Sequence, residues 1–205
     1  MSFEEERLRL IQHLRREILD QKVLDAMARI PRELFIPAGD RYLAYEDRPL
    51  SIGEGQTISQ PFIVALMTQA LQLTKNDKVL EVGAGSGYQT AILADLAREV
   101  ISVERLQTLA DTARLNLVKL GYTNTRVYLA GDVLGWPADA PYDAIMVTAA
   151  APQIPTTLLD QLKVDGRMII PVGSIWDQDL LLVIKHEKGI TVTSLTPCRF
   201  VPLIG

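Results

Sequence analysis

A short stretch near residue 80 constrains the fold of this chain more than any other part of the sequence. The mostly apolar run from Val79 to Val82 leads directly into a loop with glycine at positions 83, 85 and 87. Glycine has no Cβ, so such a loop can adopt positive φ angles and let a ligand lie against the main chain. A buried strand that ends in a glycine-rich loop and continues into a helix is typical of doubly wound folds that hold a nucleoside-bearing cofactor.

The sequence after residue 78 alternates between strand and helix patterns. Predicted strands occupy residues 79–82, 100–103, 126–130, 142–148, 167–172, 180–185 and 191–196, and predicted helices occupy residues 88–97, 106–120 and 155–162. This alternation predicts an α/β fold with a doubly wound, mostly parallel sheet and helices on both faces. The last two strands are joined through Glu187-Lys188-Gly189, a link too short for a parallel crossover, so we expect an antiparallel hairpin there.

The N-terminal segment, residues 1–61, has a different pattern. Ser2 and Glu5 have the spacing of a capping box, and an apolar stripe at helical spacing follows them. A second helix is expected from near Asp20 to the residue before Pro31, because a residue that precedes proline disfavours the helical conformation. Residues 39–61 are expected to form a long loop on the substrate side, followed by a helix over 62–71. We therefore expect a single domain, 1–205, made of this segment and an α/β core of residues 62–205.

Composition narrows the class of protein. Apolar residues make up 48% of the 205 residues and charged residues 22%, as in a globular domain. The net charge of −4 disfavours a protein that coats nucleic acid, and no apolar run is long enough to span a membrane. The acidic N-terminus is unlike a signal peptide. Cys198 is the one cysteine, which favours the reducing cytoplasm, and His13 and His186 have no ligand-like spacing, so no metal site is expected.

Two acidic residues follow the next predicted strands. Glu104 ends the second strand, 21 residues beyond Gly83, where a carboxylate can accept hydrogen bonds from both hydroxyls of a ribose. Asp132 follows the third strand, where it can accept from an adenine amino group. Each has an alternative role, Glu104 as a solvated residue before a helix and Asp132 as a turn or N-cap residue. The order of glycine loop, Glu104 and Asp132, each after its own strand, favours a cofactor site.

The spacing of the glycines distinguishes between cofactors. A dinucleotide fingerprint, Gly-x-Gly-x-x-Gly, requires glycine at position 88, where this chain has Tyr88. The spacing instead resembles the first motif of S-adenosylmethionine (SAM) methyltransferases, with their Rossmann-like fold. A nicotinamide enzyme and a simple tight turn remain the alternatives for this motif. Ser86 lacks the flanking glycines of a nucleophile elbow, and no Gly-Lys-Ser/Thr follows the loop.

Longer stretches of the sequence resemble one family, the protein-L-isoaspartate O-methyltransferases. They are GQTISQP (55–61), VLEVGAGSGY (79–88), YDAIMVTAAAP (142–152), GRMIIPVG (166–173) and RFVPL (199–203). The glycine motif is shared by many methyltransferases, whereas TISQP and AAAP are much more specific to this family. Many relatives have glycine where this chain has Val133.

The resemblance implies a cytoplasmic repair enzyme, a protein-L-isoaspartate(D-aspartate) O-methyltransferase. Such an enzyme transfers the methyl group of SAM to the free α-carboxylate of L-isoaspartyl residues in damaged proteins and peptides. It implies Ser59 as the catalytic residue and Ser59, Val201 and Pro202 as substrate contacts. The cofactor contacts expected are Thr57, Ile58, Ser59, Gly83, Ala84, Gly85, Gly87, Glu104, Arg105, Asp132, Val133 and Thr148. We expect a monomer with no nucleic-acid or membrane partner.

The chemistry of this reaction suits the residues present. An α-carboxyl group has a pKa near 3.5 and is already ionised at neutral pH, so no general base is required. The Ser59 hydroxyl can orient one carboxylate oxygen, although it can instead cap the helix that follows Pro61. Three other functions stay open: a SAM methyltransferase that acts on RNA or a small metabolite, a nicotinamide oxidoreductase, and a non-catalytic module that binds SAM as a structural ligand.

Overall fold

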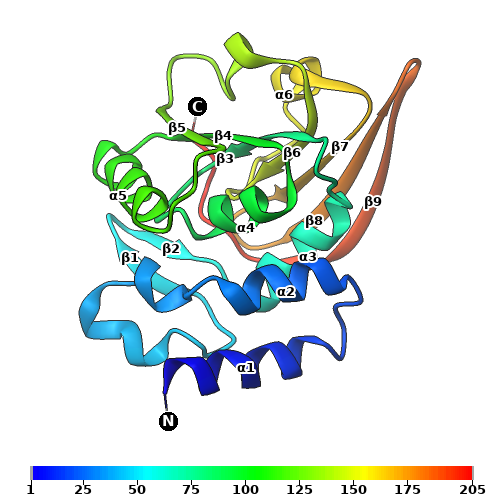
Figure 1. Cartoon of the computed structure of the whole chain (residues 1–205). Coiled ribbons are helices and arrows are strands. Elements are labelled where there is room, and N and C mark those ends of the chain that lie inside the picture. Colours follow the sequence, from blue (N-terminus) through cyan, green and yellow to red (C-terminus); the bar gives the residue numbers. More distant parts are fainter. Residues whose placement is uncertain (1, 205) are drawn as a thin grey trace.

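A seven-stranded sheet forms the centre of the computed structural model, which describes residues 2–204 (Figure 1). Its order is β5-β4-β3-β6-β7-β8-β9, with strands β3 (Lys78–Val82), β4 (Glu99–Glu104), β5 (Thr125–Leu129), β6 (Tyr142–Val147), β7 (Leu162–Gly173), β8 (Gln178–His186) and β9 (Gly189–Cys198). The pairs from β5 to β7 are parallel, and β8 and β9 are antiparallel additions. The predicted mostly parallel α/β sheet and the C-terminal hairpin are confirmed.

The chain enters the sheet in the middle. It starts at β3, moves outward through β4 and β5, and returns to the other side of β3 with β6 and β7. The strand order therefore reverses between β3 and β6, and ligands of open α/β sheets bind at the carboxyl ends of the strands at such a reversal.

The two faces of the sheet bury different side chains, because successive residues of a strand point to opposite faces. On β3, Val79 packs into the larger apolar cluster, with residues of α1 (Phe3–Leu14), α2 (Gln21–Arg29), α3 (Pro61–Leu71), α4 (Tyr88–Leu96) and α5 (Gln107–Lys119). Leu80 and Val82 pack into the second cluster, with Leu158 of α6 (Thr156–Gln161). Figure 1 shows α3 and α4 on one side of the sheet and α6 on the other, so the prediction of helices on both faces is confirmed.

The two N-terminal helices begin where the sequence predicts, and the second also ends there. Ser2 accepts a hydrogen bond from the main-chain N–H of Glu5, and the Glu5 side chain accepts one from that of Ser2, so the capping box of α1 is confirmed. Asp20 caps α2, which ends at Arg29 with Ile30 extended before Pro31. Two short 3₁₀ helices follow, η1 (Arg32–Phe35) and η2 (Ala38–Leu43), and a third, η3 (Pro137–Asp139), precedes β6.

The prediction of one long loop over residues 39–61 is wrong. Besides η2, this region contains a hairpin of β1 (Leu50–Gly53) and β2 (Gln56–Ile58). Leu50 and Ile58 lie opposite each other and are both buried, which ties the hairpin to the core. Strands of four and three residues are too short to show an alternation in the sequence, so the pattern was not visible.

Two further differences concern β7. It begins at Leu162, five residues before the predicted start at Arg167, with an irregularity in its pairing to β6. It is also antiparallel to β8, a pair that the sequence did not single out. The link between them, residues 174–177, is also too short for a parallel crossover, so the argument used for the predicted hairpin applies to it as well.

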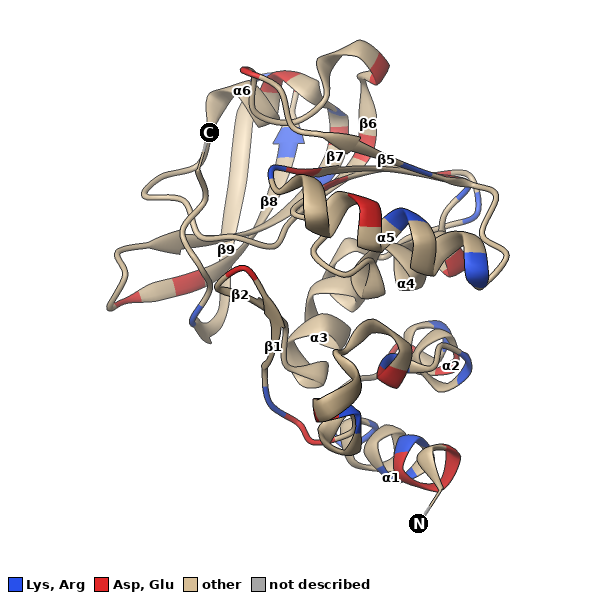
Figure 2. Ribbon diagram, turned by 90° about the vertical axis from the view of Figure 1, so that its left-hand side faces the viewer, with Lys and Arg blue, Asp and Glu red and all other residues tan. Residues whose placement is uncertain are grey.

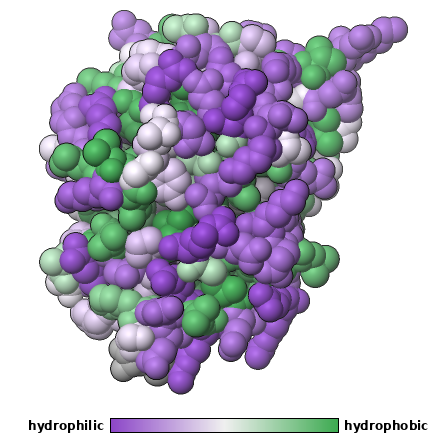
Figure 3. All heavy atoms as spheres, in the orientation of Figure 1, coloured by the Kyte–Doolittle hydropathy of each residue, from purple (hydrophilic) through white to green (hydrophobic). Residues whose placement is uncertain are grey.

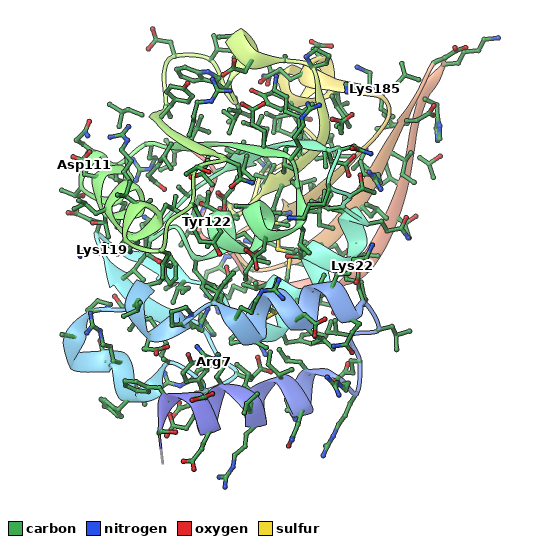
Figure 4. All side chains as sticks on the ribbon, viewed as in Figure 1. Arg7, Lys22, Asp111, Lys119, Tyr122 and Lys185 are labelled. Carbon is green, nitrogen blue, oxygen red and sulfur yellow. The ribbon has the colours of Figure 1, made fainter. Side chains whose placement is uncertain are left out.

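Polar contacts fix the ends of several elements, and two of the side chains involved, Lys185 and Tyr122, are labelled in Figure 4. The ammonium group of Lys185 on β8 donates to the carbonyl oxygens of Leu159 and Leu162 at 2.6 and 2.7 Å, at the C-terminal end of α6. The Tyr122 hydroxyl donates to Asp95 at 3.1 Å.

The face seen in Figure 3 is largely hydrophilic, and Figure 2 shows basic residues interspersed with acidic ones. Among residues 2–204, no helix is long and apolar enough to cross a membrane.

Candidate functional site

A cavity opens at the carboxyl ends of β3, β4, β5 and β6, at the reversal of strand order. Segments far apart in the sequence form its walls. They are Ile52 and residues 56–59 of the N-terminal hairpin region, Val64 and Met67 of α3, residues 82–86 with Tyr88 and Gln89, residues 103–105, Ala130, Gly131 and residues 133–135, Thr148 and Ala149, and residues 201–204.

Side chains from other segments approach the main chain of the glycine loop closely. Gly83 has a φ of +101°, and a Cβ on it would lie 2.2 Å from the Thr148 hydroxyl oxygen. That hydroxyl contacts the carbonyl oxygens of Val82 and Gly83 at 2.9 and 2.7 Å, so Thr148 fixes the start of the loop. Gly85, with a φ of +54°, lines the cavity beside Ile52. Glycine is therefore required at position 83 by geometry as well as by conformation.

Gly87 has a different task from the other two glycines. It does not line the cavity, and a Cβ on it would lie 3.2 Å from the Cα of Ala113 on α5. With a φ of +92°, it begins α4 and lets the start of that helix approach α5. The structure thus places Gly87 at a helix–helix contact beneath the predicted site.

Glu104 is held rigidly at the edge of the cavity. It is only 7% exposed, and its carboxylate accepts hydrogen bonds from the main-chain N–H groups of Gly85 (2.9 Å) and Leu106 (3.0 Å). The alternative of a solvated residue is therefore wrong. A carboxylate has lone pairs for more than two donors, so Glu104 can still accept from a vicinal diol. Arg105 follows it and also lines the cavity.

Asp132, like Gly87, is a predicted contact that does not line the cavity. Its side chain is exposed and does not line the cavity, whereas Gly131, Val133 and Leu134 on either side do. The N-cap alternative is also wrong, because no helix begins directly after it; η3 starts only at Pro137. Here the wall is formed by the loop around Asp132, including Val133, and not by the carboxylate.

Ser59 lines the cavity with Thr57 and Ile58, just before α3. The alternative in which Ser59 caps α3 is wrong, because the N-cap residue is Gln60 and its side chain makes no capping hydrogen bond. Asp47 supplies the cap instead, by accepting from the main-chain N–H of Phe62 at 2.8 Å. The Ser59 hydroxyl is thus not used by the helix.

Arg32 supports this wall from behind, and sequence reasoning missed it. Its side chain is fully buried and donates to the carbonyl oxygens of Ala44 (2.9 Å) and Ser59 (2.8 Å). Its guanidinium lies 4.9 Å from the ring centre of Tyr88, which also lines the cavity. Burial lowers the pKa of Arg32, and the adjacent Tyr88 opposes that shift. No local sequence signal marks such a residue, because its partners are 12 and 27 positions away.

Glu81, under the glycine loop, was also missed. It is completely buried, and its carboxyl group accepts hydrogen bonds from the hydroxyls of Thr90 (2.5 Å) and Ser102 (2.6 Å). Burial raises the pKa of Glu81 to about 7, although both hydroxyls act in the opposite direction. An acidic residue inside an apolar strand was the available signal, since a buried carboxyl group needs partners.

The last wall is the closing segment, residues 199–204, whose residues 201–204 line the cavity. The carbonyl oxygen of Val201 accepts from Ala150, and the N–H of Leu203 donates to the carbonyl oxygen of Ala150, both at 2.8 Å. The predicted substrate residues Val201 and Pro202 therefore share one cavity with Ser59 and the glycine loop.

The composition of the cavity restricts its chemistry. Its lining contains no histidine or cysteine, and residues 2–204 hold no cluster of side chains suited to a metal ion. The lining includes glycine main chain, the oriented carboxylate of Glu104, small hydroxyl groups and apolar side chains. These groups fit a nucleoside cofactor, and they suit a reaction whose nucleophile is already ionised.

Comparisons with known proteins agree with this geometry. The sequence model of the family described as protein-L-isoaspartate(D-aspartate) O-methyltransferase matches residues 5–205. The chain is 54% identical over 190 residues to a protein-L-isoaspartate O-methyltransferase of Methanoculleus marisnigri, covering 93% of this chain and 86% of the relative.

Two solved structures are similar over 97% of this chain. One, a protein-L-isoaspartate O-methyltransferase, has a TM-score of 0.89 and 30% identity, and 66% of its own chain is matched. The other, from Plasmodium falciparum and in complex with S-adenosyl-L-homocysteine, has a TM-score of 0.83 and 27% identity, with 98% of its chain matched.

Proposed function

The chain belongs to the protein-L-isoaspartate(D-aspartate) O-methyltransferase family, and from this premise we propose that it transfers the methyl group of SAM to the free α-carboxylate of L-isoaspartyl residues in damaged proteins and peptides. The observation that carries the proposal is the meeting, in one cavity, of the glycine loop, Glu104, Ser59 and the closing segment.

The proposal assigns the nucleoside part of SAM to the side of the cavity next to β4 and β5. Glu104 accepts from the ribose hydroxyls, and the main chain of residues 83–85 lies against the cofactor. Arg105, Val133 and Leu134 border the adenine, while Thr57, Ile58 and Thr148 border the methionine end. Of the contacts predicted from the sequence, Gly87 and Asp132 have the least support, because neither lines the cavity.

Ser59 and the closing segment receive the substrate in this proposal. SAM supplies a methyl group on a positively charged sulfur, and the C–S bond breaks as the new C–O bond forms. The Ser59 hydroxyl donates to one carboxylate oxygen and so aligns the other with the methyl group. Val201 and Pro202 cover the reacting groups and exclude water, which favours transfer because opposite charges neutralise in the reaction.

The proposal also covers the oligomeric state, the cellular location and the partners of the enzyme. We propose one domain that acts as a monomer in the cytoplasm on proteins and peptides, without nucleic-acid or membrane partners. The negative net charge and the single cysteine support this setting.

A paired-peptide assay tests the proposal. The protein is incubated with methyl-labelled SAM and one of two peptides that differ only in an aspartyl or an isoaspartyl linkage. We expect base-labile label on the isoaspartyl peptide alone. Equal labelling of both peptides, or labelling of neither, would contradict the proposed substrate.

A further inference from the structure

Two buried glutamines hold two different walls of the cavity without lining it. Gln178 and Gln161 are each 4% exposed, and each amide bonds to both a main-chain N–H and a main-chain carbonyl. The first holds the closing segment, and the second holds the loop of residues 134–136. The two walls come from segments far apart in the sequence, yet a buried glutamine amide holds the main chain of each in the same way.

Gln178 extends the pairing of β8 and β9 beyond the end of β9. It lies opposite Cys198, the last residue of β9. Its side-chain oxygen accepts from the N–H of Phe200 at 2.7 Å, and its amide nitrogen donates to the carbonyl oxygen of Phe200 at 3.2 Å. From there the chain turns back toward the point marked C in Figure 1 and forms the wall of residues 201–204.

The closing segment has few other polar anchors. Within the described chain, the main chain of residues 199–204 is hydrogen-bonded to two partners, the main chain of Ala150 and the side chain of Gln178. Arg199, Phe200 and Val201 are all at least partly accessible to solvent. The buried amide of Gln178 therefore fixes the start of this segment at Phe200, and Ala150 holds the residues that follow.

Gln161, at the end of α6, does the same for the loop after β5. Its side-chain oxygen accepts from the N–H of Trp136 at 2.8 Å, and its nitrogen donates to the carbonyl oxygen of Leu134 at 2.8 Å. Gly135 lies between them, and a Cβ there would be 2.6 Å from the Gln161 oxygen. The sequence thus leaves space for the amide at the point where the loop meets the cavity.

We propose that Gln178 and Gln161 are positioning residues that set two different halves of the site, Gln178 the peptide half and Gln161 the nucleoside half. This inference rests on the proposed function, because that function assigns the closing segment to the substrate and the loop of residues 134–136 to the cofactor. Neither glutamine touches a reacting atom. Each acts through the main chain that it holds.

The test compares Gln178→Leu with Gln161→Leu, since leucine is similar in volume and makes no hydrogen bond. The dissociation constant for S-adenosyl-L-homocysteine is measured by calorimetry, and KM for an isoaspartyl peptide is measured at saturating SAM. Q178L is expected to raise the peptide KM by about tenfold and to leave the dissociation constant within about twofold. Q161L is expected to raise the dissociation constant for S-adenosyl-L-homocysteine by about tenfold and to leave the peptide KM within about twofold. Equal effects of both variants on both constants, or no effect of either, would overturn the proposal.

Hydrogen–deuterium exchange gives a readout that does not depend on catalysis. Q178L should speed exchange in residues 199–204 and leave residues 134–136 unchanged, and Q161L should show the opposite pattern. Exchange that rises across the whole chain would assign both amides to general stability and contradict the inference.

The outcomes separate this inference from the proposed function. If the wild-type protein does not label the isoaspartyl peptide, the proposed function fails, whatever the glutamine variants do. If the wild-type protein is active and the two variants do not divide between peptide and nucleoside, the function stands and the inference fails.

Discussion

At the scale of single residues, the Ser59 hydroxyl is not used to cap α3, because Asp47 bonds to the start of that helix instead. A serine before Pro61 has a suitable position for a helix cap, but Asp47 provides that cap. Arg32 holds the Ser59 carbonyl oxygen, so the main chain is fixed while the hydroxyl is left for the cavity. This arrangement is consistent with the role proposed for Ser59, the positioning of a carboxylate oxygen.

A Ser59→Ala variant tests whether the Ser59 hydroxyl positions the substrate or only stabilises the fold. Ser59→Ala should lower kcat/KM for an isoaspartyl peptide by about tenfold, which corresponds to the loss of one hydrogen bond to a charged group. Calorimetry should find the affinity for S-adenosyl-L-homocysteine within about twofold of wild type. The control is Asp47→Ala, which should lower the free energy of unfolding by about 1 kcal/mol through the lost cap. A stability loss from Ser59→Ala equal to that of Asp47→Ala, with unchanged turnover, would contradict the positioning role proposed for Ser59.

Glu81 gives a prediction about stability and pH. Burial raises its pKa to about 7 from an ordinary value of 4.5, so the fold favours the neutral acid. The associated stability is complete below about pH 4.5 and is lost as the pH rises through about 7. Denaturant titrations should show the wild type losing roughly 3 kcal/mol relative to Glu81→Gln across this range, at about 1.4 kcal/mol per pH unit. Parallel pH profiles of the two proteins would contradict this explanation.

At the scale of elements, the glycine loop combines two functions that the sequence presents as one motif. Gly83 and Gly85 face the cavity, whereas Gly87 allows α4 to approach α5. A pattern of three evenly spaced glycines does not reveal this division, since it depends on Thr148 and Ala113, which come from other elements.

Two glycine variants test that division. Gly85→Val should abolish the binding of S-adenosyl-L-homocysteine in calorimetry, because the side chain would occupy the cavity wall. Gly87→Ala should keep binding and lower the free energy of unfolding by about 2 kcal/mol, since its Cβ meets the main chain of α5 and its φ is positive. Loss of binding in the second variant but not in the first would mean that the cofactor lies elsewhere.

The fold was largely predictable because its signals are local. Strand and helix patterns, the capping box and the short link before Gly189 each lie within a few residues, and the structure confirms them. The hairpin of residues 50–58 was not predictable, because its strands are too short to show a period. Asp132 and Val133 were both predicted as contacts in the loop after β5, and only Val133 lines the cavity, since a strand end does not fix which side chain turns inward.

The supporting residues of the site were not predictable for a different reason. Main-chain groups 22 to 27 positions away are hydrogen-bonded by the side chains of Arg32, Gln161 and Gln178. Such bonds depend on tertiary structure and leave no spacing in the sequence. The residues that face the cavity are marked by motifs, whereas the residues that hold them in place are not.

At the scale of the whole molecule, the strand order is what assembles the site. Because β3 lies between β4 and β6, the glycine loop meets Glu104 on one side and Thr148 on the other. The N-terminal hairpin and the closing segment, from opposite ends of the chain, complete the cavity. In the proposed function, the parallel core holds the nucleoside, and the hairpin and the closing segment hold the peptide.

A crystal structure with S-adenosyl-L-homocysteine and an isoaspartyl peptide tests the account most directly. We expect the ribose hydroxyls within hydrogen-bond distance of the Glu104 carboxylate, and the isoaspartyl α-carboxylate between the Ser59 hydroxyl and the cofactor sulfur, covered by Val201 and Pro202. A nucleoside bound away from residues 83–85, or a peptide carboxylate out of reach of Ser59, would contradict it.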